Sequence, residues 1–187
     1  MPKLCPASGI TICRKNNMKP LEPKNWPDTL KEIRSFLGKP LNVQSMMAHH
    51  PALMKAWMPF RNHVVANSTL SARQRELLIL RTAHNSQADY EWQHHVERGL
   101  LAGLHQVEID RVREGAGATG WQADEAALLA AADDCHRDQC IAGETLENIR
   151  QHFNVQQQLD IVTTVGMYMT LAMIIKTWNV PMEEDPA

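Results

Sequence analysis

Apolar residues recur at intervals of three and four along most of this chain, which is the periodicity of amphipathic α-helices. In segment 28–37, for example, they fall at Leu30, Ile33 and Phe36. The segment 77–80 is apolar on nearly every side, as expected for a central, buried helix. Because no useful run of alternating apolar and polar residues occurs, the sequence predicts an all-α protein.

Breaks and capping residues give the expected helix boundaries. Ser71 with Gln74, and Asn154 with Gln157, have the spacing of capping boxes. Ser86 is expected to cap the helix that follows it, and Gly103 to end that helix. Helices are therefore expected at 28–37, 43–49, 51–66, 71–85, 87–102, 105–112, 121–136, 144–152 and 155–178.

Length and composition limit the classes of protein. The chain has 187 residues, with 19 Lys and Arg against 21 Asp and Glu, a net charge of −2. This balance argues against a nucleic-acid-binding protein, which needs concentrated positive charge. Four scattered cysteines do not form a disulfide framework, which favours free thiols in the cytoplasm.

Membrane and export signals are not evident. The longest uncharged apolar run, 161–175, has fifteen residues, short of the roughly 20 that span a bilayer. The N-terminal apolar stretch is interrupted by Pro6, Ser8 and Gly9, unlike a signal peptide. We expect a disordered leader at 1–19, a helical extension at 20–50, one domain at 51–181 and a tail at 182–187.

The clearest candidate chemistry lies in segment 87–102. Glu91 and His95 are four residues apart, so a carboxylate and an imidazole share one helix face beside an apolar stripe. Such surroundings shift pKa values, as acid–base catalysis requires. Glu76, on the preceding buried helix, needs a partner if it is buried, and His95, His84 or an arginine can supply one. The alternative is an ordinary solvated Glu–His pair.

Two other site types have partial sequence support. Glu91-x-x-His94 with Asp133-x-x-His136 resembles part of a di-iron carboxylate site, but a full set needs two more glutamates and no second one is evident. Cys135 and Cys140 are five apart, out of phase with a Cys-x-x-Cys redox pair. We therefore predict no metal site and no cofactor.

Two stretches carry a family resemblance. Arg75-Glu76-Leu77, with Tyr90-Glu91-Trp92 and His95 downstream, resembles the carboxymuconolactone decarboxylase family, and the segment from Gly166 to Pro181 is similar to the end of that family's domain. The resemblance covers roughly residues 51–181. It implies an all-helical fold related to alkylhydroperoxidase D and a homo-oligomer, a trimer or hexamer.

The resemblance also implies site residues. In the peroxidase branch the corresponding helix carries Cys-x-x-Cys-x-x-x-His, and here Ala88 and Glu91 occupy the cysteine positions. Peroxidase activity is therefore not expected, and the decarboxylase branch remains. It implies His95 as proton donor, Glu91 as its partner and Glu76 as a proton relay or second base.

The predicted function is that of a lyase or isomerase without a cofactor, acting on a small unsaturated lactone or keto acid from aromatic breakdown. Its substrate-binding residues are expected to be His84, Arg81 and Trp92, with Arg81 or Arg75 holding a carboxylate. The alternatives are a non-catalytic oligomeric scaffold of the same fold, a metal-dependent enzyme and a peroxidase.

Overall fold

A computed structural model describes residues 18–183, and every element in this range is helical, which confirms the predicted all-α class. The elements are η1 (Pro23–Asn25), η2 (Asp28–Leu30), α1 (Lys31–Leu37), α2 (Asn42–Met47), α3 (Pro51–Asn62), η3 (His63–Asn67), α4 (Ala72–Asn85), α5 (Asp89–Leu101), α6 (Gln106–Val112), α7 (Ala123–Asp138), α8 (Gly143–His152) and α9 (Val155–Trp178).

The expected leader falls largely outside the described residues, as do Cys5 and Cys13. Of the leader, only Met18 and Lys19 are described, and Met18 packs against the hydrophobic core. The domain boundaries drawn from the sequence stay predictions.

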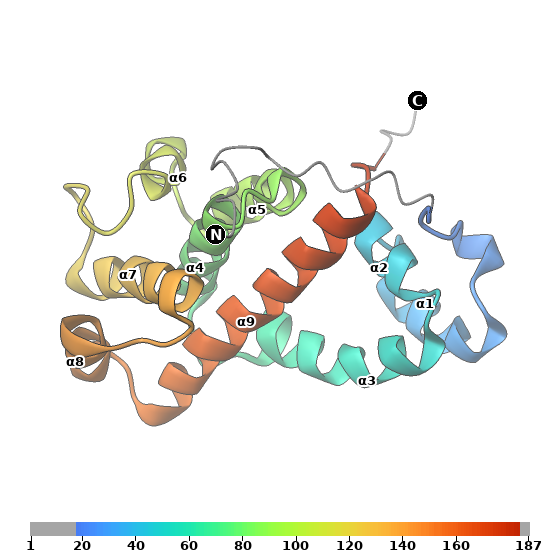
Figure 1. The fold of residues 1–187 in the computed structure, drawn as a ribbon, viewed down its shortest axis with the longest axis horizontal. Helices are drawn as coiled ribbons and strands as arrows, with labels where there is room; N and C mark the ends of the chain where they lie inside the picture. The colour runs from blue at the N-terminus through green and yellow to red at the C-terminus, as the bar shows by residue number, and fades with distance from the viewer. Residues whose placement is uncertain (1–17, 184–187) are drawn as a thin grey trace, which may run out of the picture.

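Helix α4 is the centre of the fold, in contact with α5, α7 and α9. Its apolar run from Leu77 to Leu80 is fully buried, as the sequence predicts. Helix α9 crosses the middle of the molecule, with α6 to α8 on one side and α1 to α3 on the other (Figure 1). One core cluster joins the N-terminal extension, α3 and α9, and two further clusters lie around α4 and α7.

Helix α9 is the one described helix that is long and apolar enough to cross a membrane by length and composition. Its 18-residue window has a mean hydropathy of 1.5, but half of that window is buried against other helices. Burial on this scale is also found in the central helix of a folded core, so length and composition alone do not make α9 a membrane segment.

The predicted caps are confirmed with one exception. Ser71 Oγ accepts from Gln74 N at 3.2 Å, and Gln74 Oε1 accepts from Ser71 N at 3.1 Å. Asn154 and Gln157 form the same box before α9. Gly103 ends α5 with φ of +89°, a conformation that glycine adopts without strain.

The prediction that Ser86 caps α5 is wrong. The Ser86 N–H still bonds to the Thr82 carbonyl at 2.9 Å, so Ser86 ends α4 instead. Ala88 then precedes α5 without a side-chain cap. Because α4 extends to Asn85 with Ser86 as its C-cap, α5 begins only at Asp89, and its N-cap position falls on Ala88.

The expected helix 51–66 is also divided. Helix α3 contains Pro59, which has no N–H for the carbonyl four residues earlier, and the chain widens into the π-helical turn η3 shortly after it. Asp160 on α9 secures this turn from outside. Its Oδ2 accepts from Thr69 N at 2.6 Å, and its Oδ1 lies 2.6 Å from His63 Nε2.

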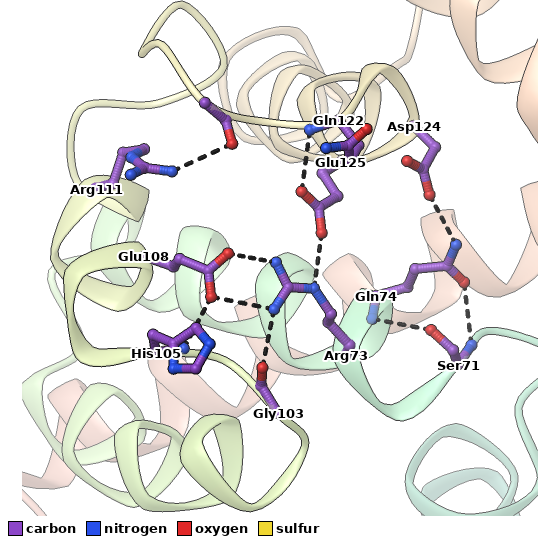
Figure 2. A network of polar contacts seen from close by, with 11 residues as sticks. Ser71, Arg73, Gln74, Gly103, His105, Glu108, Arg111, Gln122, Asp124 and Glu125 are labelled. Atoms are coloured by element: carbon purple, nitrogen blue, oxygen red, sulfur yellow. Dashed lines mark hydrogen bonds and ion pairs between the residues drawn. The ribbon is translucent and has the colours of Figure 1, made fainter.

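One arginine joins three segments at the start of α4 (Figure 2). Arg73 Nε donates to Glu125 Oε1 at 2.7 Å, and Arg73 Nη2 donates to Glu108 Oε1 at 2.6 Å. Arg73 Nη1 also donates to the Gly103 carbonyl at 3.0 Å. Because each carboxylate also caps its own helix, Arg73 fixes the starts of α6 and α7 against α4.

The extension is fastened to the domain by the C-terminal segment. Glu183 Oε1 accepts from Asn42 N at 2.6 Å and from the Tyr90 hydroxyl at 2.6 Å. Asn42 Nδ2 in turn donates to the carbonyls of Pro181 and Met182. These bonds hold the start of α2 against α5, the helix that carries the candidate site.

Candidate active site

Glu76 and His95 form a buried pair between α4 and α5. Glu76 Oε2 lies 2.5 Å from His95 Nδ1, and both side chains are almost completely buried. On the other side of the ring, Arg98 Nη1 lies 3.2 Å from His95 Nε2. The pairing of Glu76 with His95 expected from the sequence is present.

The hydrogen bonds define the state of the imidazole. A guanidinium can only donate, so His95 Nε2 accepts from Arg98 with its lone pair. The proton of the neutral ring is then on Nδ1, which donates to Glu76. Burial lowers the pKa of His95 in spite of the opposing effect of Glu76. His95 is therefore a neutral imidazole with a basic nitrogen, Nε2, beside Arg98.

Glu91 completes the group from one turn earlier on α5. Its Oε2 lies 3.6 Å from His95 Nε2. This distance is too long for a direct hydrogen bond but short enough for one water molecule or one substrate atom to contact both groups. Burial raises the pKa of Glu91 to about 7, although Arg98 opposes this shift. Near neutral pH, Glu91 thus holds a proton for part of the time, as a general acid requires.

The three groups lie between two cavities. The outer cavity measures about 370 Å³, and Glu76 and His95 line it together with Arg61, Val65, Ala72, Arg75, Arg98, Leu101, Ala102 and Tyr168. The inner cavity measures about 40 Å³. His95 and Arg98 line both cavities, while Glu91 lines the inner one, where α2 supplies Val43, Gln44 and Met47.

Three arginines give the outer cavity a positive character. Arg61, Arg75 and Arg98 all line it, and within residues 18–183 none of them forms an ion pair with a carboxylate. Burial lowers the pKa of Arg61, which reflects the cost of its desolvated charge. Guanidinium groups without a carboxylate partner favour an anionic ligand, especially a carboxylate.

Tyr168 from α9 contacts His95 of the Glu76–His95 pair. Its ring meets His95 edge to face, with centroids 5.0 Å apart and the planes at 89°. Tyr168 lines both cavities, and burial raises the pKa of its phenol, which keeps the hydroxyl protonated. Sequence reasoning missed Tyr168, Arg61 and Arg98. Of these, Arg98 had a local signal, since it lies three residues after His95.

The predicted substrate-binding residues lie elsewhere, which corrects that part of the sequence interpretation. Neither Arg81, His84 nor Trp92 lines the outer or the inner cavity. Arg81 binds Asp133 through Nε at 2.6 Å. Residue 81 is five positions after Glu76, about 140° further around the helix, so it points toward α7 rather than toward His95.

His84 and Trp92 belong to a neighbouring surface cluster. The two rings lie 6.2 Å apart, and the Arg113 guanidinium stands 4.5 Å from the centre of the Trp92 indole. This cation–π contact covers one face of the Trp92 indole.

The two half-motifs of the di-iron alternative do not converge. The Asp133 carboxylate, on α7, accepts hydrogen bonds from Arg81 and Asn85. Glu91, on α5, faces His95 instead. Across residues 18–183, no group of three or more His, Cys, Asp or Glu side chains is arranged to hold a metal ion. The described cysteines also lie away from the cavities: Cys140 is exposed, and burial raises the pKa of Cys135 to about 11.

The sequence of this region matches a known family. Residues 51–134 match the model of the carboxymuconolactone decarboxylase family. In this segment the chain is similar to the carboxymuconolactone decarboxylase family. The match spans α3 to α7 and so includes the helices that carry Glu76, Glu91 and His95.

Solved structures extend the likeness over most of the chain. The debrominase Bmp8, a cysteine-to-alanine variant in complex with 2,3,4-tribromopyrrole, has a TM-score of 0.75 at 13% identity, covering 91% of this chain and 94% of that one. An uncharacterised peroxidase-related protein from Silicibacter sp. TM1040 has a TM-score of 0.75 at 17% identity, covering 94% and 96%.

A third structure, the alkylhydroperoxidase AhpD core of an uncharacterised peroxidase-related protein from Ralstonia eutropha JMP134, has a TM-score of 0.73 at 18% identity. It covers 90% of this chain and 94% of that chain. No curated protein matches the sequence. At these identities the likeness establishes the alkylhydroperoxidase D-like fold, and the activity has to be argued from the site.

Replacing Glu91 is expected to stabilise the folded protein at neutral and basic pH. The native carboxyl keeps its proton up to a pH of about 7, whereas its ordinary pKa is 4.5. The folded state therefore binds more protons between these values, and the free energy of unfolding falls as pH rises through this window. Glu91→Gln removes the titrating group, so we expect it to raise stability at pH 8 by about 3 kcal/mol.

Urea unfolding of both proteins at pH 5, 6, 7 and 8 measures this effect. Glu97→Gln, an exposed position on the same helix, is the matched control and is expected to change little. A wild-type stability that does not fall from pH 5 to pH 8 relative to Glu91→Gln contradicts the prediction.

Proposed function

We propose that this protein is an enzyme that acts by acid–base chemistry, without a cofactor, on a small unsaturated lactone or keto acid bearing a carboxylate. Decarboxylation is the favoured reaction and isomerisation of the same skeleton is the close variant. The observation that supports it is a neutral His95 and a protonatable Glu91 beside a cavity that three unpaired arginines line.

The arrangement suits the two charge changes of a decarboxylation. As the bond to the carboxyl carbon breaks, its electron pair moves into the conjugated carbonyl and CO₂ leaves. Arg98, within 3.2 Å of His95 Nε2, is placed to stabilise the resulting enolate oxygen. A proton must then be added to carbon, and one proton is taken up from solvent in each turnover.

The geometry favours a different division of roles from the one that the resemblance implies. His95 Nε2 accepts a hydrogen bond from Arg98, so in the resting state it has no proton to donate. Glu91, with its raised pKa, is the better source of the proton. Because Glu91 lines the inner cavity and His95 lines both, the proton reaches a substrate in the outer cavity by way of His95. We therefore assign Glu91 as the acid, His95 as the base or relay, and Glu76 as the group that orients and balances the imidazole.

The test is turnover of a panel of carboxylated unsaturated lactones and the corresponding keto acids in D₂O. We expect CO₂ release with one deuterium incorporated at carbon, and a rate that falls above a pH of about 7 as Glu91 loses its proton. Binding of these acids with neither CO₂ release nor deuterium exchange would overturn the enzymatic proposal in favour of the binding or scaffold alternative.

Arg75 is expected to contribute to binding more than to chemistry. It lines the outer cavity on α4, one residue before Glu76, without contact to His95 among the described hydrogen bonds. Loss of a charged hydrogen bond costs about 1.5–3 kcal/mol, so Arg75→Gln should raise KM about 10- to 100-fold with little change in kcat. Steady-state kinetics measure this, with Arg111→Gln as a control arginine remote from the cavity; an equal fall in kcat contradicts it.

We also propose that the protein acts in the cytoplasm. The free thiols of Cys135 and Cys140 agree with a reducing compartment.

A further inference from the structure

The proposed proton relay needs a nitrogen that Arg98 engages. A proton that passes from Glu91 to a substrate by way of His95 must first be accepted by His95 Nε2, which lies 3.6 Å from Glu91 Oε2. The same nitrogen accepts a hydrogen bond from Arg98 Nη1 at 3.2 Å. An imidazole nitrogen that accepts has a single lone pair, so it serves one donor at a time. While Arg98 keeps this contact, His95 cannot take up a proton.

Arg98 is held by fewer bonds than the arginines that join the helices of the fold. Arg73 and Arg81 each make four hydrogen bonds to carboxylates and backbone carbonyls. Among residues 18–183 the Arg98 guanidinium makes one, to His95. A guanidinium has five N–H donors, so most donors of Arg98 are left for a ligand. The side chain is half-buried and lines both cavities, within reach of a ligand in either.

An anionic ligand competes with His95 for this guanidinium. Hydrogen bonds between charged groups are about twice as strong as those between neutral groups, and a carboxylate can accept two parallel bonds from one guanidinium. His95, in contrast, is a neutral acceptor that offers one lone pair. Arg61 and Arg75 line the outer cavity with Arg98 and add to the attraction for an anion there. A carboxylate in the outer cavity is therefore the better partner for Arg98.

We propose that Arg98 is a substrate-operated gate on His95. It occupies His95 Nε2 in the free protein, and a carboxylate bound in the outer cavity draws the guanidinium away and opens this nitrogen to the proton of Glu91. The inference rests on the proposed function for the use of that proton: His95 Nε2 accepts it, His95 then donates it to the substrate carbon, and Glu91 regains a proton from solvent. The relay is thus active only when an acid is bound.

The surroundings of His95 set the direction of the pH effect. The charged or titratable groups around it are Glu76 from α4, Glu91, His94 and Arg98 from α5, Tyr168 from α9 and Arg61 from α3. Burial lowers the pKa of His95, Glu76 opposes this, and Arg98 and His94 lower it further. Departure of Arg98 and arrival of a carboxylate both raise this pKa. Binding of an acid and protonation of His95 therefore favour each other.

The test uses 2-furoate, a small unsaturated ring acid that lacks the ring carbonyl needed to receive the electron pair of a decarboxylation. Nitrogen-15 NMR follows the His95 ring from pH 5 to 9, with and without saturating 2-furoate. The protein carries Glu91→Gln, so that the Glu91 carboxyl does not titrate in the same range. We expect 2-furoate to raise the pKa of His95 by roughly one pH unit or more. Uncharged 2-furamide, of the same shape, should leave the His95 signals unchanged.

Adding Arg98→Met separates the gate from simple attraction, because a bound anion by itself raises the pKa of His95 whether or not Arg98 is present. With Arg98→Met the pKa of His95 should already be higher without ligand, and 2-furoate should raise it less than half as much. Arg75→Gln is the matched control, a cavity arginine without a hydrogen bond to His95. It should weaken 2-furoate binding and keep the full pKa change at saturation. Circular dichroism verifies that each variant is folded.

Three results would overturn the gate: no binding of 2-furoate, equal pKa changes with and without Arg98→Met, or a change that Arg75→Gln abolishes at saturation. These results are independent of the turnover panel, since 2-furoate is bound and not converted. Turnover in the panel without a change at His95 rejects the gate alone. A gated His95 without turnover of any panel acid rejects the enzymatic proposal and retains Arg98 as an anion-operated control of His95 protonation.

Discussion

His95→Ala is expected to lower kcat/KM by about 10³-fold on the substrate that the panel identifies, because it removes the proton-transferring group. His95 is nearly inaccessible and has Glu76 on one nitrogen and Arg98 on the other, so no neighbouring side chain replaces it. Because His95 lines the outer cavity, the space that its ring leaves in His95→Ala is open to that cavity. We therefore expect added imidazole to restore part of the activity.

Chemical rescue separates catalysis from structure. If His95 only packs the site, imidazole restores stability without restoring turnover. His152→Ala, at an exposed position in the last turn of α8, is the control and should keep full activity without a response to imidazole. An activity of His95→Ala within about threefold of wild type contradicts the assignment of His95 as base or relay.

Arg73→Met is expected to destabilise the fold by about 3 kcal/mol at pH 7, because it leaves two poorly exposed carboxylates without their cation. The Glu125 side chain is 8% exposed and that of Glu108 is 15% exposed. Both retain a backbone N–H as partner, at Gln122 and His105, which limits the loss. For a chain of this size the melting temperature should fall by roughly 10 °C.

The effect of Arg73 depends on pH in a definite direction. The hydrogen bond from Arg73 lowers the pKa of Glu108 to about 2 against an ordinary value of 4.5. The stability from this pair is complete above the ordinary pKa and is lost as pH falls toward 2. Arg73→Met should therefore differ from wild type at pH 7 and approach it at pH 3.

Urea unfolding at the two pH values measures this difference. The control is Arg150→Met, since Arg150 and Glu147 form an exposed pair whose loss should cost less than about 1 kcal/mol. Equal losses from the two arginines would show that the network of Figure 2 contributes no more than a surface pair.

The helices and two of the three active groups were visible in local patterns. Apolar periodicity and the capping boxes at Ser71 and Asn154 depend on contacts within about one turn, which sequence spacing records directly. Glu91 and His95 lie four apart on one helix, so their proximity is likewise local. Where two helices compete for one turn, as at Ser86, this local reasoning failed.

The composition of the cavity depends on packing between elements. Arg61, Arg75 and Tyr168 come from α3, α4 and α9, and nothing in their local sequence distinguishes them from Arg81 or His84. Which arginine faces a cavity and which binds a carboxylate is decided by rotation about each helix axis and by the neighbour it meets. Arg81 meets Asp133 on α7, and Arg75 meets open space beside His95.

The sequence by itself determined an all-helical chain, its main helix boundaries and a carboxylate–imidazole pair on one helix face, because these follow from interactions between near neighbours. The tertiary structure decided that Glu76 reaches His95, that burial raises the pKa of Glu91 and that three arginines surround the site. Desolvation and charge pairing depend on every helix packed around a group, and those distances exist only in the assembled fold.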